Sequence, residues 1–334
     1  MRYLLATLTL FAVAHLQAQE YRHPSATDPG YLGESNRFMF FENYWLNMQH
    51  WAYNMSSYAQ EDPLDKVMGE VYDQLSDKDR LTLENAVTFY QDEILQYDLR
   101  IGELTYYFKR WIVTQQNSIP QEVPEQFRPL MDQLVALKPL YDKYYWPEHH
   151  AANVAVYEDN IDLIRSLEDT AVLDLEQLCH AEWQEEKIRV DISYHSKLSR
   201  PYTTVTPVAH IVMDSRRNAT PAGNWFELLL HETSHHMIDD DSGFVGGTIL
   251  DVAAIGRYRL PRQLSHSFLF YLSGKVAQRH LLDSYPEYEL YMVRRGVFAR
   301  SFDLLREHLD PYIAGEVSLH DATREFMEAY WEEE

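Results

Sequence analysis

The chain has little cysteine, few basic residues relative to acidic ones, and no long apolar run beyond its first residues. Its one cysteine, Cys179, cannot form a disulfide within the chain. The 29 lysines and arginines stand against 52 aspartates and glutamates, which gives a formal net charge of −23. This charge disfavours nucleic acid and anionic membrane surfaces as partners. Because a membrane-spanning helix needs roughly 20 apolar residues, we expect no stable membrane anchor.

Aromatic residues, in contrast, are abundant, with 24 Tyr, 14 Phe and 7 Trp among 334 residues. A chain of this composition can bury a substantial core and is not expected to be disordered over most of its length. The length suits one large domain or two closely packed lobes. Nothing in the sequence sets the oligomeric state.

Residues 1–18, MRYLLATLTLFAVAHLQA, have the pattern of a secretory signal peptide. Arg2 precedes an apolar run from Leu4 to Ala14, and the small residue Ala18 suits a cleavage site. No cysteine lies near this position, which disfavours a lipoprotein. We therefore expect an exported protein that is periplasmic or secreted.

Residues 19–145 are expected to form an N-terminal helical region. An extended connection reaches about residue 36, and aromatic residues are then dense from Phe38 to Tyr58. Helical patterns follow at Leu64–Leu75, at Asp77–Gln116 with an interruption, and at Glu125–Tyr145. The pair Trp146-Pro147 opens a second region, 146–334, in which two helices are expected up to about Ala181.

Two strands are expected in the second region. From Lys187 onward, apolar residues alternate with polar ones (Ile188, Val190, Ile192 and Tyr194), which is the pattern of a strand with one buried face. The stretch Val205–Asp214 predicts a second strand. A strand so close to the next helix in the chain offers its edge to an extended peptide backbone.

The stretch Asn224–Asp239, NWFELLLHETSHHMID, predicts a metal-binding helix. His231 and His235 are four residues apart, so they project from the same helical face and can ligate one metal ion. Glu232 lies about 100° round the helix, where it can serve as a general base. Such a His-Glu-x-x-His arrangement is typical of zinc-dependent hydrolysis.

A catalytic zinc ion usually has three protein ligands, so a further one is needed. Asp241 is ten residues after His231, but Ile238 occupies the position where the metzincin pattern has a turn glycine. Asp251 follows a Gly-Thr sequence that faintly resembles the aspzincin signature. We favour His266, because it lies at the start of an expected helix beginning near Pro261 and imidazole is a good zinc ligand.

The run HIVMDSRRN…ELLLHETSHHMID…LSHSFLFYLSGK resembles a little-characterised family of bacterial zincin-like metallopeptidases of the gluzincin type. The resemblance covers about half of the mature chain and excludes the N-terminal helical region. It implies a zincin core and supports His266 as a ligand. The matching positions are His210, His231, Glu232, His235, His266, Tyr271 and Gly274.

We therefore expect a mainly α-helical α+β protein with a zincin-like metallopeptidase core and a small antiparallel sheet next to the metal-binding helix. His231, His235 and His266 would hold Zn²⁺, and Glu232 would act as general base on a peptide or protein substrate. Tyr271 is the preferred donor to the developing oxyanion, with Tyr202 and His210 as alternatives. Tyr271 is about 140° round a helix from His266, however, so a straight helix does not aim both at one point.

Two other functions use the same residues. A non-catalytic zincin-fold protein would use the metal and helices for recognition, although such proteins often lose the general base that this chain keeps as Glu232. A zinc amidase or esterase acting on cell-envelope substrates would need the same metal and carboxylate.

Overall fold

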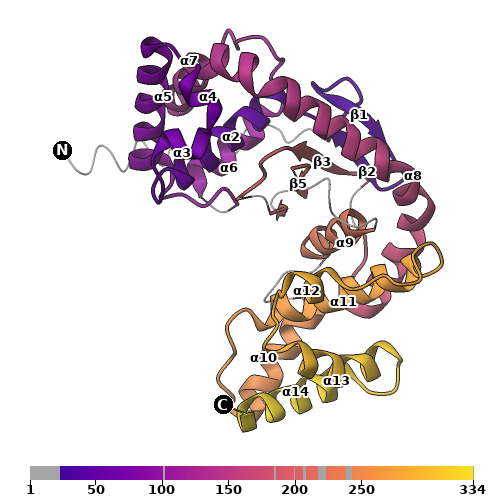
Figure 1. The fold of residues 1–334 in the computed structure, drawn as a ribbon. Helices are drawn as coiled ribbons and strands as arrows, with labels where there is room; N and C mark the ends of the chain where they lie inside the picture. Colours follow the sequence, from indigo (N-terminus) through magenta and orange to yellow (C-terminus); the bar gives the residue numbers. More distant parts are fainter. Residues whose placement is uncertain are drawn as a thin grey trace.

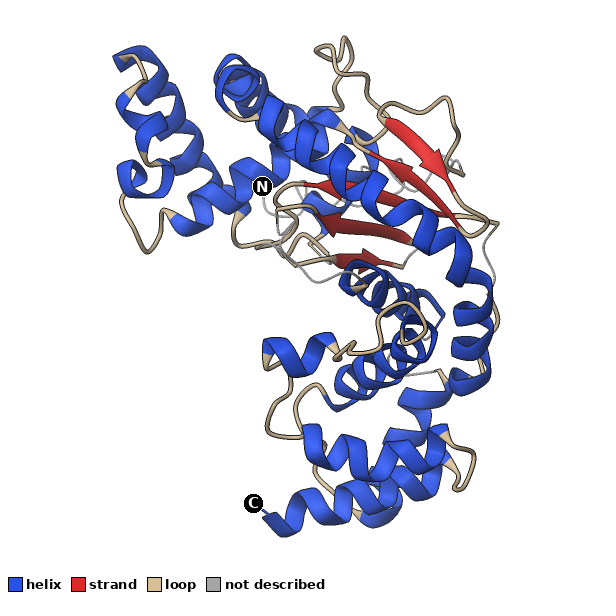
Figure 2. Cartoon of the chain, turned by 45° about the vertical axis from the view of Figure 1, so that its right-hand side comes forward, coloured by secondary structure: helices blue, strands red, loops and turns tan. Residues whose placement is uncertain are grey.

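The computed structural model describes residues 23–100, 102–183, 186–198, 200–205, 208–216, 223–237 and 243–333. The predicted signal peptide, residues 1–18, lies outside the described residues. The fold is mainly helical with one small sheet (Figures 1 and 2). The strands are β1 (Tyr31–Glu34), β2 (Phe38–Phe41), β3 (Ile188–Ser193), β4 (Tyr202–Thr204) and β5 (His210–Asp214).

The N-terminal helices confirm the helical patterns predicted from Leu64 to Tyr145, with an interruption between Ile94 and Glu103, whereas β1 and β2 in the same region were not predicted. These helices are α2 (Tyr44–Tyr58), α3 (Leu64–Met68), α4 (Glu70–Asp73), α5 (Asp77–Phe89), the π-helical turn η1 (Tyr90–Ile94), α6 (Glu103–Ile112), the 3₁₀ turn η2 (Glu125–Phe127) and α7 (Arg128–Tyr144). The later helices are α8 (Trp146–Cys179), α9 (Asn224–Met237), α10 (Phe244–Gly256), α11 (Leu264–Leu281), α12 (Tyr291–Arg295), α13 (Phe302–Ile313) and α14 (Leu319–Glu333).

The sheet has the order β1-β2-β3-β5-β4 and is mixed. The pairs β2–β3 and β3–β5 are parallel, whereas β1–β2 and β4–β5 are antiparallel. The prediction of an antiparallel sheet is therefore wrong for its centre. Alternating side chains predict a strand but not its direction, and the long helical crossover between β2 and β3 brings the chain back in the same direction.

The two faces of the sheet differ in chemistry. On one face, apolar residues such as Val190 and its partner Ile211 pack in a core shared with α8 and α9. On the other, polar residues of β3 meet α2, where Nδ1 of His50 lies 3.0 Å from Oγ of Ser193. All six residues of β3 are buried. The prediction of a single buried face is wrong because the polar face is covered too.

Helix α8 is a single helix of 34 residues, not the two helices predicted. No glycine or proline occurs between Glu148 and Cys179, so nothing in the backbone breaks it. At about 1.5 Å per residue it is about 50 Å long. Near its start His149 contacts Tyr141 of α7, and near its end Asp174 contacts His280 of α11. The helix therefore links the N-terminal helices to the C-terminal ones (Figure 1).

The described residues form two apolar cores. One lies among α2, α5, α6 and α7, and the other joins the sheet to α8 and the helices after it. Strands β1 and β2 precede residue 146, yet they pair with β3 in the sheet of the second region. Among the residues that the structure describes, none of the helices combines the length and apolar character that a membrane crossing requires.

Candidate metal centre

His231 and His235 lie one turn apart on α9, which confirms the predicted helix. The apolar residues of α9 pack in the core with α8 and α11, so the helix is buried over most of its length. His231 is only 3 % exposed, and the centroids of the two imidazole rings are 4.8 Å apart. The pair therefore lies at the boundary between the core and the surface.

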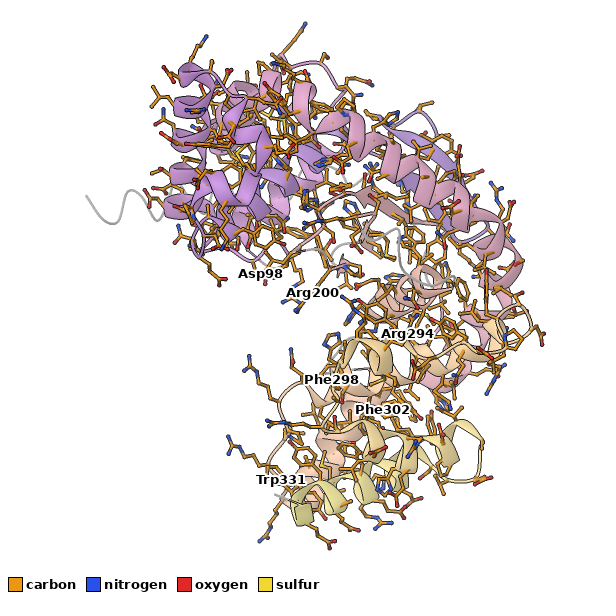
Figure 3. All side chains as sticks on the ribbon, in the orientation of Figure 1. Asp98, Arg200, Arg294, Phe298, Phe302 and Trp331 are labelled. Atoms are coloured by element: carbon orange, nitrogen blue, oxygen red, sulfur yellow. The ribbon has the colours of Figure 1, made fainter. Side chains whose placement is uncertain are left out.

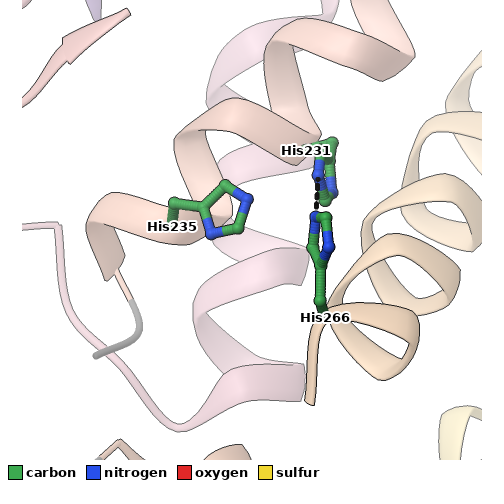
Figure 4. Close-up of side chains that lie close together, drawn as sticks. All are labelled: His231, His235 and His266. Carbon is green, nitrogen blue, oxygen red and sulfur yellow. Dashed lines mark hydrogen bonds between the residues drawn. The ribbon is translucent and has the colours of Figure 1, made fainter. Parts of the chain in front are cut away.

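His266, near the start of α11, completes a cluster of three imidazoles (Figure 4). Its Nε2 atom lies 3.1 Å from Nε2 of His231. One ring nitrogen from each of the three histidines lies within 4.8 Å of the others. Of the competing candidates, Asp241 lies outside the described residues and Asp251 is exposed on α10, outside the cluster. The structure thus brings together the three histidines that the sequence selected.

The donor set of this cluster fits a metal ion. Two nitrogen ligands at about 2.0–2.1 Å from a tetrahedral zinc ion lie roughly 3.3–3.4 Å apart, close to the separation of the two Nε2 atoms. Burial, together with the neighbouring His235 and His266, holds the pKa of His231 well below its usual range. Its ring is therefore neutral, with a lone pair available for coordination. The other nitrogen, Nδ1, is buried and has no hydrogen-bond partner among the described residues.

Glu232 is buried beside the cluster and is held by the edge strand β4. Thr203 Oγ1 lies 2.7 Å from the Oε2 atom of Glu232 and 2.9 Å from its backbone oxygen. The register directs Thr203 to the face with Ile211, towards α9, so this contact follows from the strand pairing. Burial raises the pKa of Glu232, although the charge of His235 and the Thr203 hydrogen bond oppose the rise. A carboxylate with this environment suits a general base.

The structure does not bring Tyr271 to the histidines. Its hydroxyl donates to Oδ1 of Asp310 on α13 at 2.7 Å, and its ring packs against Phe302. The physical reason is the helical rotation between His266 and Tyr271, which turns the tyrosine towards α13. The residue of α11 that does meet the cluster is Phe270, one turn after His266, whose ring centroid is 4.0 Å from that of His231.

The alternative oxyanion donors are also engaged elsewhere. The hydroxyl of Tyr202 lies 2.8 Å from Nε2 of His50, and Nε2 of His210 lies 2.7 Å from Oδ2 of Asp191. Both contacts lie on the polar face of the sheet, which is opposite the face that carries Thr203. Neither side chain therefore reaches the three-histidine cluster.

Three further histidines, outside the cluster, contact other side chains of the fold. His236 is partly buried, with its ring 6.0 Å from that of Trp183. Nδ1 of His149 contacts the hydroxyl of Tyr141 at 2.9 Å. Nδ1 of His150 lies 2.6 Å from Oε1 of Glu42.

Sequence analysis missed an aromatic wall around the cluster. Phe298 meets His266 with ring centroids 5.6 Å apart, and Tyr291 stacks on Phe270 at 6.1 Å. Phe298 has a φ of 54°, a left-handed conformation that costs on the order of 1–3 kcal/mol for a bulky residue. Strained residues of this kind concentrate at functional sites. These aromatic residues are far from His231 and His266 in the sequence, and no sequence pattern links them to the histidines. Only the packing of α12 against α11 in the folded chain identifies the wall.

Sequence analysis also missed Glu227, one turn before His231 on α9. This buried carboxylate accepts hydrogen bonds from the hydroxyl of Tyr288 and from the backbone nitrogen of Tyr291, the latter at 2.9 Å. Burial raises its pKa to about 7, against the opposing effect of these hydrogen bonds and of Arg294. Glu227 therefore ties the start of α12 to α9.

The N-terminal region also contributes charge to the site, because Arg100 acts on Glu232 and lowers its pKa. When the described side chains are drawn, an open space remains between the N-terminal and C-terminal helices (Figure 3). Asp98 and Arg200 border it on one side, and Arg294 and Phe298 on the other. Helix α9 lies between the two sides (Figure 1).

Comparisons of the chain with protein-family models, with curated proteins and with solved structures gave no match.

Proposed function

We propose that this protein is an exported zinc-dependent metallohydrolase, and specifically a peptidase. The observation that carries the proposal is the cluster of His231, His235 and His266, with nitrogen atoms within 4.8 Å of one another. The buried carboxylate of Glu232 lies beside it on the same helix. Export is supported by the signal-peptide pattern of residues 1–18.

The three histidines would hold the metal and leave a further position open for substrate or water. When bound, zinc supplies Lewis-acid chemistry, which polarises a carbonyl group and lowers the pKa of water. Glu232 takes a proton from the attacking water at its carboxylate and passes it to the leaving amine. Thr203 fixes the carboxylate through its hydrogen bond to Oε2. Because the hydroxyl has one proton, it donates either to that oxygen or to the backbone oxygen of Glu232.

A peptide substrate is favoured by the position of β4. This strand is at the edge of the sheet and contacts α9, so its outer backbone groups run beside Glu232. An edge strand can pair with an extended peptide through backbone hydrogen bonds. Such pairing would lead the substrate backbone past Thr203 to the three histidines. An ester or a cell-wall amide lacks the regular backbone that this edge matches.

Metal content and peptide hydrolysis test the proposal together. We expect about one zinc ion per chain in the purified mature protein, measured by elemental analysis, and its loss in His266→Ala. Glu232→Gln should keep the metal but lose about 10²- to 10⁴-fold in hydrolysis of a peptide library. His236→Ala is the matched control on the same helix, and we expect it to keep both metal and activity.

Each other outcome selects a different function. A wild-type protein that binds no metal would end the hydrolase proposal. Metal without any cleavage, in both peptide and ester assays, would favour a non-catalytic zincin-fold binding protein. Cleavage of cell-envelope amides or esters but not of peptides would identify a zinc amidase or esterase.

A further inference from the structure

Arg294, on the short helix α12, is a charged side chain whose donors are not used within the described fold. Its Nε and Nη2 atoms are both buried, and neither has a hydrogen-bond partner among the described residues. Buried guanidinium nitrogens are costly to leave without an acceptor, so native proteins rarely do so. This arrangement indicates that an acceptor from outside the chain belongs beside Arg294.

The nearest carboxylate, Glu227, does not fill this role. Its two oxygens accept hydrogen bonds from the hydroxyl of Tyr288 and the backbone nitrogen of Tyr291. Arg294 lies close enough to lower the pKa of Glu227, but the two form no ion pair within 4.0 Å among the described residues. The guanidinium carbon lies 5.8 Å from the centroid of the Tyr288 ring, a cation–π distance. Arg294 therefore contacts the Tyr288 ring but has no acceptor for its Nε and Nη2 donors among the described residues.

Arg294 is linked to the three-histidine cluster indirectly, through Glu227 and through the aromatic residues on either side of it in the chain. Glu227, which Arg294 influences, is four residues before His231, a rise of about 6 Å along α9. Tyr291 stacks on Phe270, which covers His231, and Phe298 covers His266. Arg294 lies in the chain between these two contacts. It also borders the open space between the two sides of the molecule (Figure 3).

Local charge supports an anionic ligand at this position. The chain as a whole has a net charge of −23, yet the segment from Arg294 to Arg306 contains four arginines and one acidic residue, Asp303. Arg306 pairs with Asp303, and the other arginines give this segment of an acidic molecule a positive balance, which favours an anion beside it over the surrounding surface. A planar guanidinium suits a carboxylate in particular, because two parallel hydrogen bonds can form.

We propose that Arg294 binds a carboxylate of the substrate next to the bond that is hydrolysed, with an apolar side chain packed on the wall of Phe270, Tyr291 and Phe298. This inference rests on the proposed function and adds its substrate class. A free C-terminal carboxylate and an acidic side chain share this chemistry. The first source makes the enzyme a carboxypeptidase, and the second makes it selective for acidic residues.

Binding to an inactive protein tests this without turnover. We would load Glu232→Gln with zinc and titrate three acetylated tripeptides: Ala-Ala-Phe with a free carboxylate, the same peptide as an amide, and Ala-Phe-Glu as an amide. Calorimetry should show at least about tenfold tighter binding of one carboxylate-bearing peptide than of the neutral amide. The preferred peptide identifies the source of the carboxylate.

The arginine is tested by adding a second substitution to Glu232→Gln. Arg294→Gln should remove the preference for a carboxylate, and Arg294→Lys should keep part of it because the charge remains. The matched control is Arg295→Gln, since Arg295 is the exposed neighbour on α12. Thermal melting and zinc content of each double variant show whether the site is still folded.

Two results would overturn the inference: equal or absent binding of all three peptides, or a carboxylate preference that survives in folded Arg294→Gln. Failure of the proposed function looks different. In that case wild type would cleave no peptide and no ester, whereas carboxylate binding that depends on Arg294 would persist. The substrate class and the hydrolytic activity are therefore tested separately.

Discussion

The molecule buries two groups of histidines, one on each face of the sheet, and they differ in what their nitrogens meet. On the α9 side, Nε2 of His231 faces Nε2 of His266 at 3.1 Å. On the α2 side, His50 lies between the oxygens of Ser193 and Tyr202, and His210 contacts Asp191 at 2.7 Å. In the α9 group, an imidazole nitrogen lies against another imidazole nitrogen. In the α2 group, each of these imidazole nitrogens lies against an oxygen atom.

This difference separates a cluster that could hold a metal ion from a structural network. Imidazoles beside hydroxyl and carboxylate oxygens exchange hydrogen bonds, so they are satisfied without a ligand. Burial lowers the pKa of His50 and of His210 to about 3, and both rings are therefore neutral at ordinary pH. Imidazoles that direct lone pairs at one point gain most from a cation placed there. Burial alone does not distinguish the two groups.

The largest expected effect comes from breaking the structural network at Asp191. Arg189 and His210 both contact this buried carboxylate, and although burial opposes ionisation, they hold its pKa well below its usual range. Asp191→Asn leaves the buried Arg189 without full compensation. We expect it to lower the free energy of unfolding by about 3–5 kcal/mol, measured by urea denaturation.

The control for Asp191→Asn is His235→Ala in the other group, which should lose metal while the metal-free protein keeps most of its stability. Asp191→Asn should therefore lower the stability and keep the metal, whereas His235→Ala should lose the metal and keep most of the stability. If Asp191→Asn remains folded but releases the metal, the two faces are coupled and the comparison between them fails.

The next effect concerns pH and the buried Glu227. Its pKa is about 7 in the folded protein against a usual value of 4.5, so between these values the folded state binds the extra proton. Stability from this group is present below about pH 4.5 and is lost as the pH rises through 7. Glu227→Gln removes this dependence. Relative to metal-free wild type it should gain on the order of 3 kcal/mol between pH 4.5 and pH 8.

Thermal or urea unfolding of metal-free protein at several pH values measures this gain. Asp310→Asn is a useful comparison, because Asp310 is a carboxylate that also accepts a tyrosine hydroxyl but is more exposed. Parallel pH profiles of wild type and Glu227→Gln would show that Glu227 ionises as freely as in the unfolded chain.

The smallest expected effect is at Thr203, where the sheet reaches α9. Thr203→Val keeps the shape of the side chain but removes the hydroxyl that contacts Glu232. We expect kcat to fall about tenfold, or about 1.4 kcal/mol in the barrier, with KM and metal content nearly unchanged. Thr203→Ser should restore most of kcat. A variant that instead raised KM alone would assign Thr203 to substrate binding and not to positioning of the base.

Much of the site could be predicted from spacing because helical geometry fixes it locally. Residues four apart share a face, so His231 and His235 needed only a helix, and the helix followed from the apolar residues around them. His266 followed from a second helical pattern at a suitable chain distance. Tyr271 was less well determined, since the same geometry turns it away from His266, and the structure places it against Asp310.

The partners of these residues could not be predicted, because they come from distant parts of the chain. Thr203 meets Glu232 through the pairing of β4 with β5, and Arg100 acts on it from the N-terminal region. Tyr291 reaches Phe270 through the packing of α12 on α9 and α11, and Phe298, which follows α12, meets His266. Side-chain periodicity contains no information about such long-range contacts.

By itself, then, the sequence determined the local features: a mainly helical chain, the helix that carries His231 and His235, and the three histidines that face one another. Only the tertiary structure decided the direction of the strands, the single long α8, and the burial of both faces of β3. The physical reason is the range of the interactions. Helical spacing acts over four residues, whereas strand direction and the satisfaction of buried polar groups depend on segments that meet only when the whole chain has folded.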